Sequence, residues 1–588
     1  MEQSSIFSEL AKEMENNRIR KKIAYVAGDS IYSPLGFSTE ENMRAIYLGK
    51  SAIHRVCDPL IFSKPFNGAK IEKEADFSSI ADNGENFTLL EKRIIYSIED
   101  AIKSSGLSPE LVKCGKTRLI IATTKGNIDL LEGKCDNIDK RAYLGELALR
   151  ISRYMGLKQK PLVVSNACIS GISALITAAR LIEYDECDNV IVAGADLMTK
   201  FVVSGFEAFH SISETVCTPY DVKRDGLSLG EAAGTIILTS LRSMLADNDP
   251  IVIEGGSVTN DSNHLSAPSR TGDGLGEAML TAMAEARISG SSVDFVNAHG
   301  TATIYNDEME SRAIHWASLM NVPVQSLKPY WGHTLGASGV IESIASFWQI
   351  KNSLLIGTKG FNEAGVPMEI KVSSHHRECA LSRCVKSASG FGGCNAAIVF
   401  AKESVSNYPG TGREEKWSEV SSFKLTGEVN FDTIIRDHYK EMEMKDIKFF
   451  KMDDLSKLGV IATARLLCGF DSLDKYSRFE RGFFMANSVS SLESDIKHQR
   501  ITEKEGDLLA SPAVFVYTLP NIVLGESAIR NKFQGENSFF VADASDKSEI
   551  MGELLSLAQK SSLKLVVAGW CEFLNGNFDV DLKLYKRE

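Results

Sequence analysis

One cysteine and two histidines in this sequence lie in surroundings that suit covalent chemistry. Cys168 closely follows an apolar run at residues 162–165, and residues 172–183 after it show helical apolar spacing. His299 and His333 lie far downstream, each in a glycine-containing loop next to an expected strand or helix. Proteins use a thiol nucleophile with an imidazole partner for covalent catalysis. The thiol and the two imidazoles together predict a site for covalent catalysis by a cysteine.

The position of Cys168 predicts an activated thiol. A strand, a sharp turn and a helix place Cys168 near a helix N-terminus, where the helix dipole and free amides favour the thiolate and lower the thiol pKa. The alternative is that a lone cysteine beside small residues merely packs well, and for Cys168 taken alone this alternative is preferred. The downstream histidines shift the balance toward catalysis.

Each histidine loop has a structural alternative as well. A lone loop histidine is more often structural than catalytic, but two of the ten histidines in glycine-framed loops, together with the cysteine, are less expected by chance. Lys328 lies five residues before the second histidine, and Asp307 and Glu310 follow His299 on the next expected helix. The two carboxylates are expected to orient His299, to tie loops together or to hold a cation; the alternative is a charge effect at a helix N-terminus.

A fourth feature is the glycine-rich stretch at residues 387–395, which is expected to form a turn between two strands. Such a turn can bring backbone N–H groups close to a reacting carbonyl oxygen. Most glycine-rich turns only reverse the chain, so this stretch alone is weak evidence. It is not a phosphate-binding loop, because it lacks the Lys-Ser/Thr ending and leads into a strand.

The elements that must position these residues alternate between strands and helices. Short apolar runs bounded by turn residues indicate buried strands, and apolar residues at helical spacing indicate helices. The alternation predicts a layered α/β architecture. Strands are expected at 23–27, 119–123, 162–165, 190–194, 234–238, 295–298 and 396–400, and helices beginning near 38–41 and at 89–103, 172–183, 275–289 and 341–351.

Composition limits the class of protein. The formal charge of -12, from 65 Lys and Arg against 77 Asp and Glu, argues against a broad nucleic-acid-binding face. No apolar run reaches the ~20 residues needed to cross a bilayer, and the polar start does not resemble a signal sequence, so a cytoplasmic protein without a membrane span is expected. Eleven cysteines without paired spacing predict neither a disulfide framework nor a metal site.

The end of the chain resembles an earlier part of it. A chain of 588 residues is long enough for several domains or a duplicated one. Residues 539–546 align with 162–169, and 565–570 align with 190–195, so the tail is expected to be a partial second copy. Ser545 occupies the position of the thiol, and the tail contains nothing comparable to the two histidine loops.

The four motifs, in this order, resemble the β-ketoacyl-acyl carrier protein synthases of the thiolase fold, in the elongating class with a Cys-His-His triad. The resemblance covers residues 23–402 and extends to 28–36, 45–51 and 219–231. It implies an α/β thiolase fold with two pseudo-repeated α/β halves in layers, followed by an extra C-terminal α/β half that resembles the N-terminal one. The expected divisions are a polar extension at 1–22, an N-terminal half at 23–247, a C-terminal half at 248–402, a linker at 403–425 and a truncated ketosynthase-like domain at 426–588.

The resemblance also implies a reaction. An acyltransferase of the 3-oxoacyl-ACP synthase type would join an acyl group on Cys168 to a malonyl group on acyl carrier protein by decarboxylative Claisen condensation, in fatty-acid or polyketide- or polyene-type biosynthesis. His299 and His333 would assist decarboxylation and stabilise the enolate. The only cofactor would be the phosphopantetheine that the carrier protein brings, and a homodimer is expected. The other implied roles are Lys328 as a catalytic residue that supports His333, Asp307 and Glu310 as structural support, the backbone N–H groups of Cys168 and Phe391 as the oxyanion hole, and Thr301, Thr303, Phe391 and Phe206 as contacts of the substrate and its pantetheine arm.

The sequence departs from the family pattern in three places. Thr218 stands where arginine is common, Cys394 stands where threonine is usual, and residues 143–160 are atypical; these departures concern the substrate and the dimer contacts. The main alternative is a non-catalytic partner, like a chain-length factor, that binds carrier protein. A thiolase or hydrolase that uses Cys168 is a third interpretation, and the intact thiol, histidines and lysine favour the synthase.

The tail is expected to be inactive, because it lacks the thiol and both histidine loops. The hypothesis is a structural or chain-length-setting module packed on the synthase. Its removal should then change solubility, assembly or product length while leaving acylation of Cys168 possible. The alternative is a decayed appendage.

Overall fold

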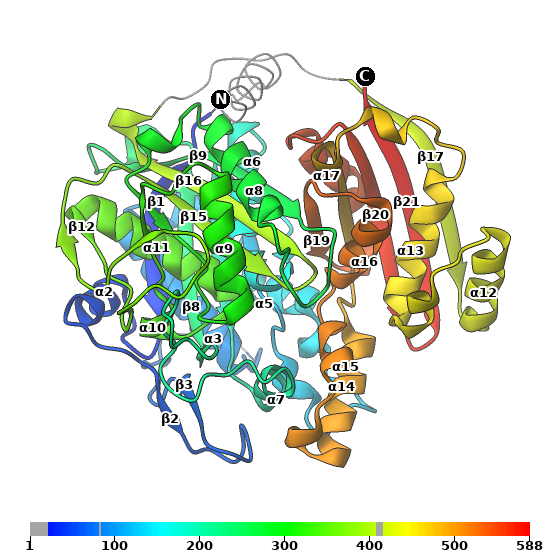
Figure 1. The fold of residues 1–588 in the computed structure, drawn as a ribbon, viewed down its shortest axis with the longest axis horizontal. Helices are drawn as coiled ribbons and strands as arrows, with labels where there is room; N and C mark the ends of the chain where they lie inside the picture. The colour runs from blue at the N-terminus through cyan, green and yellow to red at the C-terminus, as the bar shows by residue number, and fades with distance from the viewer. Residues whose placement is uncertain (1–21, 81–83, 407–415) are drawn as a thin grey trace.

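The computed structural model describes residues 22–80, 84–406 and 416–588 (Figure 1). Nearly all of the expected extension at 1–22, and residues 407–415 of the expected linker, lie outside the described residues. A sheet of 16 strands runs through the described part of the chain. In order across the sheet, its strands are β13 (Lys371–Val372), β11 (Pro323–Gln325), β10 (Phe295–Asn297), β15 (Arg383–Gly390), β16 (Cys394–Lys402), β9 (Ile251–Asn260), β1 (Tyr25–Tyr32), β8 (Ala232–Thr239), β6 (Asn189–Asp196), β4 (Thr117–Ala122), β5 (Leu162–Val164), β19 (Asn537–Val541), β18 (Arg481–Asn487), β20 (Leu565–Leu574), β21 (Asn577–Arg587) and β17 (Trp417–Gly427).

Helices cover this sheet and two small sheets flank it. The small sheets are formed by β2 (His54–Val56), β3 (Phe66–Ala69) and β7 (Leu229–Gly230), and by β12 (Leu354–Leu355) and β14 (Arg377–Glu378). The α-helices are α2 (Thr39–Tyr47), α3 (Leu89–Ser105), α4 (Pro109–Val112), α5 (Leu144–Met155), α6 (Ser170–Glu183), α7 (Lys200–Ala208), α8 (Asp273–Glu285), α9 (Ile304–Trp316), α10 (Lys328–Trp331), α11 (Ser338–Asn352), α12 (Phe431–Glu441), α13 (Asp454–Leu467), α14 (Leu492–Glu505), α15 (Pro512–Val516), α16 (Ile522–Asn531) and α17 (Lys547–Gln559).

The strand pairing repeats one pattern three times. In the first unit β1, β8 and β6 pair antiparallel in turn, and β6, β4 and β5 pair parallel. The second unit repeats this order with β9, β16, β15, β10 and β11. The third unit, in the tail, repeats it with β17, β21, β20, β18 and β19. The prediction of a fold with two pseudo-repeated halves and an extra C-terminal half is confirmed.

Two buried helices lie at the centre of the first two units. α6 packs against β6 and β9, and α11 packs against β8 and β15. Every residue of α6 is buried, and all except Arg180 and Glu183 are small or aliphatic. On the outer faces α3 covers β1 and β8, and α8 covers β9 and β16. The N-termini of α6 and α11 therefore meet in the middle of the layers, where Cys168 and His333 precede them.

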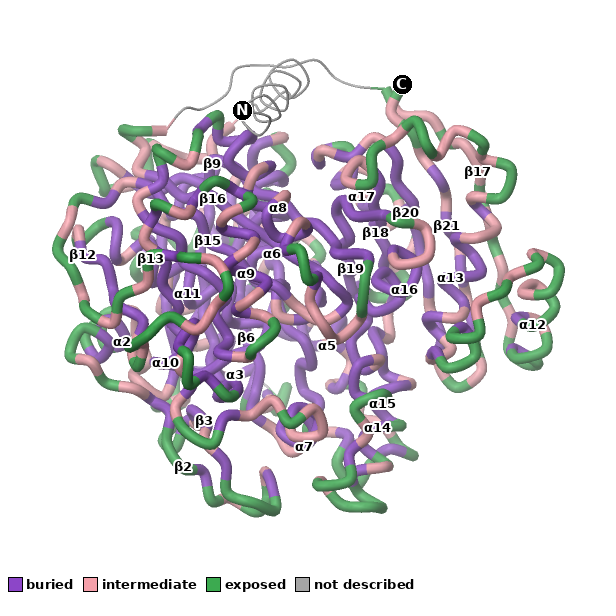
Figure 2. The backbone as a smooth tube through the Cα atoms, in the orientation of Figure 1, coloured by how far each residue is buried: buried purple, intermediate pink, exposed green. Residues whose placement is uncertain are grey.

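The tail joins the first unit edge to edge. β19 pairs antiparallel with β5, with Phe540 opposite Val164 and Val541 opposite Val163. Next to this pair, the N–H of Phe539 donates to Asn166 Oδ1 at 2.8 Å. Apolar residues of both units share the same buried clusters, and Figure 2 shows buried chain on both sides of this junction. The tail is therefore part of the folded core and not a loosely attached appendage.

The linker expected at 403–425 extends too far toward the C-terminus, because residues 417–425 belong to a strand. β17 begins at Trp417 and pairs with β21 as far as Gly427. It is the last strand of the sheet, and its residues are half-buried or exposed. Edge strands of this kind carry polar side chains, so β17 lacks the apolar run by which the other strands are recognised.

The strands and helices expected around the site agree with the structure to within a few residues at each end. The sequence did not predict β9, although all of its residues are buried. Glu254 and two glycines interrupt its apolar run, and the carboxylate of Glu254 is neutralised by Arg383 at 2.7 Å. None of the helices in the described ranges has the length and apolar character needed to cross a bilayer.

Candidate active site

Cys168 lies in the turn between β5 and α6. The turn contains a 3-10 segment, Ala167–Ile169, and the Ser170 hydroxyl closes it by donating to Ala167 O at 2.6 Å and accepting from Asn166 N at 2.8 Å. Ala167 has a φ of 47°, a left-handed conformation that is unfavourable for residues other than glycine. The structure confirms the predicted order of strand, sharp turn and helix around the thiol.

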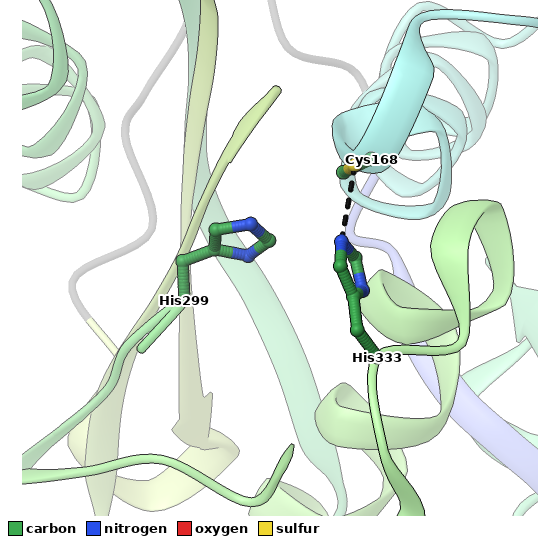
Figure 3. Close-up of side chains that lie close together, drawn as sticks. All are labelled: Cys168, His299 and His333. Atoms are coloured by element: carbon green, nitrogen blue, oxygen red, sulfur yellow. Dashed lines mark hydrogen bonds between the residues drawn. The ribbon is translucent and has the colours of Figure 1, made fainter. Parts of the chain in front are cut away.

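His333 lies beside Cys168 (Figure 3). Its Nε2 is 3.1 Å from Cys168 Sγ, and its Nδ1 is 3.0 Å from Ser338 Oγ. The preceding Gly332 has a φ of 72°, and a Cβ there would lie 2.5 Å from the carbonyl oxygen of Leu229. Only glycine fits this close backbone approach. The glycine in the loop therefore allows the chain to direct His333 at the thiol.

His299 faces the same space from the end of β10 (Figure 3). Its ring centroid lies 5.2 Å from that of His333, and the two rings are nearly perpendicular. The thiol sulfur and one nitrogen of each ring lie within 4.8 Å of one another. Among the described residues the buried Nδ1 of His299 has no hydrogen-bond partner. The three side chains therefore converge on one space.

The two carboxylates after His299 hold its loop through backbone hydrogen bonds. Glu310 accepts from the N–H groups of His299 and of the next glycine, each at 2.7 Å. Asp307 accepts from Thr301 N at 3.1 Å. Tyr220 binds both carboxylates, donating from its N–H to Asp307 and from its hydroxyl to Glu310, each at 2.7 Å. These donors occupy the carboxylate oxygens, so the geometry favours a loop-holding role over cation binding.

Lys328 belongs to a buried ion cluster. Its Nζ lies 2.9 Å from Glu342 Oε1, and Lys386 Nζ lies 2.7 Å from Glu342 Oε2, with each of these side chains at most 3% exposed. Two lysines share one carboxylate, and burial lowers the pKa of Lys386 although the charge of Glu342 opposes the shift. The sequence-based prediction missed Lys386 and Glu342. The available signal was a single carboxylate within the otherwise apolar helix α11, because a buried charge needs a partner.

Burial and the charge of Lys328 shift the pKa values of the two histidines and of the thiol. Burial, followed by the charge of Lys328, lowers the pKa of both His299 and His333 well below the usual 6.5. Both rings are therefore neutral at pH 7, and each offers one N–H donor and one acceptor nitrogen. Burial raises the pKa of the Cys168 thiol to about 12, although Lys328 opposes the shift. The prediction that the helix N-terminus lowers this pKa is wrong, because desolvation of the thiolate is the largest contribution and raises the pKa.

Alkylation of Cys168 should consequently become faster as the pH rises through the neutral range. The thiolate is the reactive form, and below a pKa of about 12 its fraction grows roughly tenfold per pH unit. Iodoacetamide labelling, followed by mass spectrometry of the Cys168 peptide, is expected to show this rise without a plateau below about pH 9. The exposed Cys57 in the same sample serves as the control for reagent quality. A plateau of the Cys168 rate near pH 7 would contradict the raised pKa.

The thiol and the histidines open into a cavity of about 330 Å³. This volume is within the range of small-molecule sites. Lys328, Asp307 and Glu310 do not line the cavity and lie behind it. The predicted site residues that do line it are Cys168, Phe206, His299, Thr301, Thr303, His333 and Phe391.

The predicted oxyanion turn connects β15 and β16 and contacts Cys168. A Cβ on Gly390 would lie 3.1 Å from Cys168 N, so the glycine lets the turn bring Phe391 close to the nucleophile. Asn521, in the tail, donates from its side-chain amide to Phe391 O at 2.8 Å. A Cβ on Gly392 would lie 2.6 Å from the same amide nitrogen. The tail therefore supports the turn, a contact that has no local signal in the sequence.

A metal ion is the other ligand that this donor set could bind. One thiolate and two imidazoles are typical zinc ligands, and the three ligand atoms lie within 4.8 Å of one another. The adjoining cavity, however, is large enough for an organic substrate. The hydrogen bond between His333 and Cys168 is the contact that nucleophilic catalysis requires.

The sequence is similar to two domains of a known protein family and to characterised relatives. The beta-ketoacyl synthase N-terminal domain matches residues 21–243, and the C-terminal domain of that family matches residues 251–362. The 3-oxoacyl-[acyl-carrier-protein] synthase 2 of Vibrio harveyi is 28% identical over 411 residues, which cover 65% of this chain and 99% of the relative. The protein of the same name from Vibrio cholerae serotype O1 is 27% identical over 412 residues, with the same coverage of each chain.

Solved structures share the fold. A beta-ketoacyl synthase from Burkholderia phymatum STM815 has a TM-score of 0.60 and 22% identity, covering 65% of this chain and 99% of that chain. The PfaC keto synthase-chain length factor has a TM-score of 0.76 and 15% identity and covers 96% of this chain and 78% of that chain, so its match includes the tail. Because the two matched domains together span more than half of the sequence, the protein belongs to the beta-ketoacyl synthase family.

Proposed function

We propose that this protein is an acyltransferase of the 3-oxoacyl-ACP synthase type, which joins an acyl group on Cys168 to a malonyl group on acyl carrier protein by decarboxylative Claisen condensation. The observation that carries the proposal is the 3.1 Å contact between Cys168 Sγ and His333 Nε2, with His299 facing both across the cavity. The 3-oxoacyl-[acyl-carrier-protein] synthase 2 relatives, matched over 99% of their length, support the same reaction.

The first step transfers the acyl group to Cys168. His333 Nε2 takes the thiol proton as the sulfur attacks the thioester carbonyl, and the carbonyl oxygen becomes an oxyanion. The N–H groups of Cys168 and Phe391 are proposed to stabilise this charge. The carbon–sulfur bond to the pantetheine arm then breaks, and the departing sulfur recovers the proton. Because the proton moves to His333 as the sulfur attacks, a thiol with a pKa of about 12 can react at neutral pH without a free thiolate accumulating.

The second step breaks and forms a carbon–carbon bond. The malonyl carboxylate leaves as carbon dioxide, and its electron pair generates an enolate on the thioester. The neutral rings of His299 and His333 can each donate one N–H to the enolate oxygen. The enolate carbon attacks the acyl carbonyl, Cys168 leaves as thiolate, and the thiolate takes up a proton from solvent. The Ser338 hydroxyl 3.0 Å from His333 Nδ1 can donate or accept, so it supports both tautomers that the two steps need.

A carrier protein is the proposed substrate carrier, and its phosphopantetheine is the only cofactor proposed. The cavity adjoins a larger depression of about 780 Å³, and the two share residues such as Ala267 and Tyr305. Basic side chains outnumber the three carboxylates in this depression, which favours an acidic partner and its phosphate. The basic side chains are Arg270, Arg312, Arg478 and Lys532.

The proposal also covers the oligomeric state and the cellular location of the protein. The edge of β5 is already paired with β19, so the proposed homodimer would use a different surface. Light scattering of the purified protein would measure its oligomeric state. We propose a cytoplasmic location, because the spacing of the eleven cysteines predicts no disulfide framework. A product assay would show whether the protein acts in fatty-acid biosynthesis or in polyketide- or polyene-type biosynthesis.

The competing interpretation is a non-catalytic partner that binds carrier protein without being acylated. Mass spectrometry of the protein incubated with acyl-carrier-protein thioesters separates the two. A mass increase on the Cys168 peptide, followed by release of a β-ketoacyl product when malonyl carrier protein is added, supports the synthase. No acylation with any chain length would support the non-catalytic partner.

Replacement of either histidine should separate the two steps. His299→Ala is expected to retain acylation of Cys168 and to lower condensation by roughly 10²–10⁴-fold, because one donor to the enolate is removed. His333→Ala should lower condensation similarly and also slow acylation, because the proton acceptor next to the thiol is lost. Pre-steady-state acylation and product formation would be measured on the same samples. His375→Ala, an exposed histidine, is the matched control. Unchanged condensation in His299→Ala would contradict the assigned role.

A further inference from the structure

A short 3-10 helix in the tail presents apolar side chains to solvent. This helix, η8 (Ile447–Lys451), connects α12 to α13, which lie at the opposite end of the molecule from α2 and β12 (Figure 1). Residues three apart lie on the same side of a 3-10 helix. Ile447 and Phe450 therefore form one ridge, and they are 81% and 50% exposed. Exposed apolar side chains that adjoin one another mark a candidate interaction surface.

The other two sides of η8 differ from this ridge. Phe449, with Met452 directly after the helix, faces the core of the tail, and both side chains are buried. Lys448 and Lys451 are three apart on the third side, and both are exposed. The helix is therefore anchored on one side and displays an apolar ridge and a basic ridge to solvent. This is the arrangement of an amphipathic segment that lies on a membrane surface.

Hydrogen bonds and a ring contact hold η8 in place. The Asp446 carboxylate caps the helix by accepting from Lys448 N at 2.9 Å, and it also pairs with Arg530 of α16. The Tyr439 hydroxyl donates to Asp446 O at 3.1 Å, and the centroid of its ring lies 4.9 Å from that of Phe450. The apolar ridge is thus presented in a fixed conformation, so binding does not have to order it.

The size of the ridge and its charge identify the partner. A stable protein partner covers about 800 Å² and roughly 20–30 residues on each side, whereas the apolar ridge of η8 consists of two side chains. The interfacial region of a bilayer accepts such single aromatic and aliphatic side chains, and anionic headgroups attract the lysines beside them. Because the whole chain has a formal charge of -12, an anionic bilayer attracts it only where basic side chains are exposed.

We propose that η8 is a peripheral attachment site for an anionic phospholipid bilayer. Ile447 and Phe450 enter the headgroup region, and the ammonium groups of Lys448 and Lys451 contact lipid phosphates. Two apolar side chains bury little surface, so the attachment is reversible and depends on the lysines. The site is separate from the cavity at Cys168, so it does not depend on the proposed reaction.

The test is flotation of the purified full-length protein with lipid vesicles. The vesicles contain phosphatidylcholine alone or phosphatidylcholine with about one third phosphatidylglycerol. The wild type is expected to float with the anionic vesicles at least tenfold more than with the neutral ones, and to be released when salt rises from about 0.05 M to about 0.5 M. Lys448→Gln combined with Lys451→Gln should lower binding by about tenfold. Ile447→Ser combined with Phe450→Ser should lower it to a similar extent.

The matched control is Leu508→Ser combined with Leu509→Ser. These adjacent leucines of the tail are also exposed, at 49% and 63%, but they follow Asp507 and have no lysine beside them, so this variant should float like the wild type. Circular dichroism would confirm that all variants are folded. Equal flotation of the wild type with both kinds of vesicle, or with neither, would overturn the inference. Wild-type flotation of either η8 variant would also overturn it.

Acylation of Cys168 by carrier-protein thioesters, measured on the same variants without vesicles, separates this inference from the proposed function. The η8 variants are expected to be acylated at the wild-type rate. A wild type that floats but is not acylated would overturn the proposed function alone, and one that is acylated but does not float would overturn the attachment site alone.

Discussion

Replacement of Cys168 by alanine is expected to abolish acylation and to lower condensation by at least ~10³-fold, the scale on which loss of a covalent nucleophile acts. The thiol is the group that His333 contacts at 3.1 Å. Without it no acyl-enzyme can form, and within the described part of the chain Cys168 is the cysteine that clusters with the two histidines. Binding of carrier protein should persist, because the depression outside the cavity is unchanged.

The measurements are the mass of the intact protein after incubation with acyl thioester and the rate of β-ketoacyl product formation. Cys57→Ala, which alters an exposed cysteine, is the control and should behave as the wild type. Acylation of Cys168→Ala at the wild-type rate would place the acyl group elsewhere and remove the basis of the proposed mechanism. A folded Cys168→Ala protein is expected, since the side chain becomes smaller and the turn is closed by Ser170.

Truncation after Ser406 is expected to leave the synthase part insoluble or unfolded. The sequence alone favoured a tail whose removal leaves Cys168 acylation possible, and the structure changes that expectation. Truncation exposes the edge of β5 next to the nucleophile, and an unpaired buried edge promotes aggregation. It also leaves Arg180 without Glu536, its buried partner at 2.8 Å, and breaking such a pair is strongly destabilising.

The informative control supplies the missing part as a separate chain. Residues 1–406 and 416–588, produced together, are expected to co-purify as a one-to-one complex and to recover acylation. Soluble yield, circular dichroism and acylation of Cys168 would be compared among the truncated protein, the two-chain complex and the full chain. A truncated protein that is soluble, folded and acylated at the full-chain rate would show that the β5–β19 pairing contributes nothing to the fold.

The agreement between sequence and structure is best where the signal is local. The strand before Cys168 is an apolar run, the helix after it has helical spacing, and the glycines beside His299 and His333 mark loops. Each of these features depends on neighbouring residues, so each can be recognised along the chain. The internal similarity of 539–546 to 162–169 likewise predicted the third repeat of the strand order, although not where it would dock.

The predictions failed where an edge or a buried charge hides the pattern. β17 carries polar side chains because it is the last strand of the sheet, so it was assigned to a linker. Glu342 and Lys386 are charged residues within buried elements, and their pairing is visible only when α11 packs on β15. The thiol pKa was predicted in the wrong direction because burial, which dominates it, is a property of the folded protein.

The sequence by itself singled out Cys168, His299, His333 and the glycine-rich turn as a candidate site and predicted the repeated α/β architecture, because these depend on residue types and short-range spacing. Only the tertiary structure decided that the tail completes the site. Phe540 meets Val164, Asn521 holds Phe391 and Asp495 pairs with Lys125 across separations of more than a hundred residues. Such contacts depend on the register of two paired strands and on which polar groups are buried next to each other. Neither property can be predicted from a local segment of the sequence.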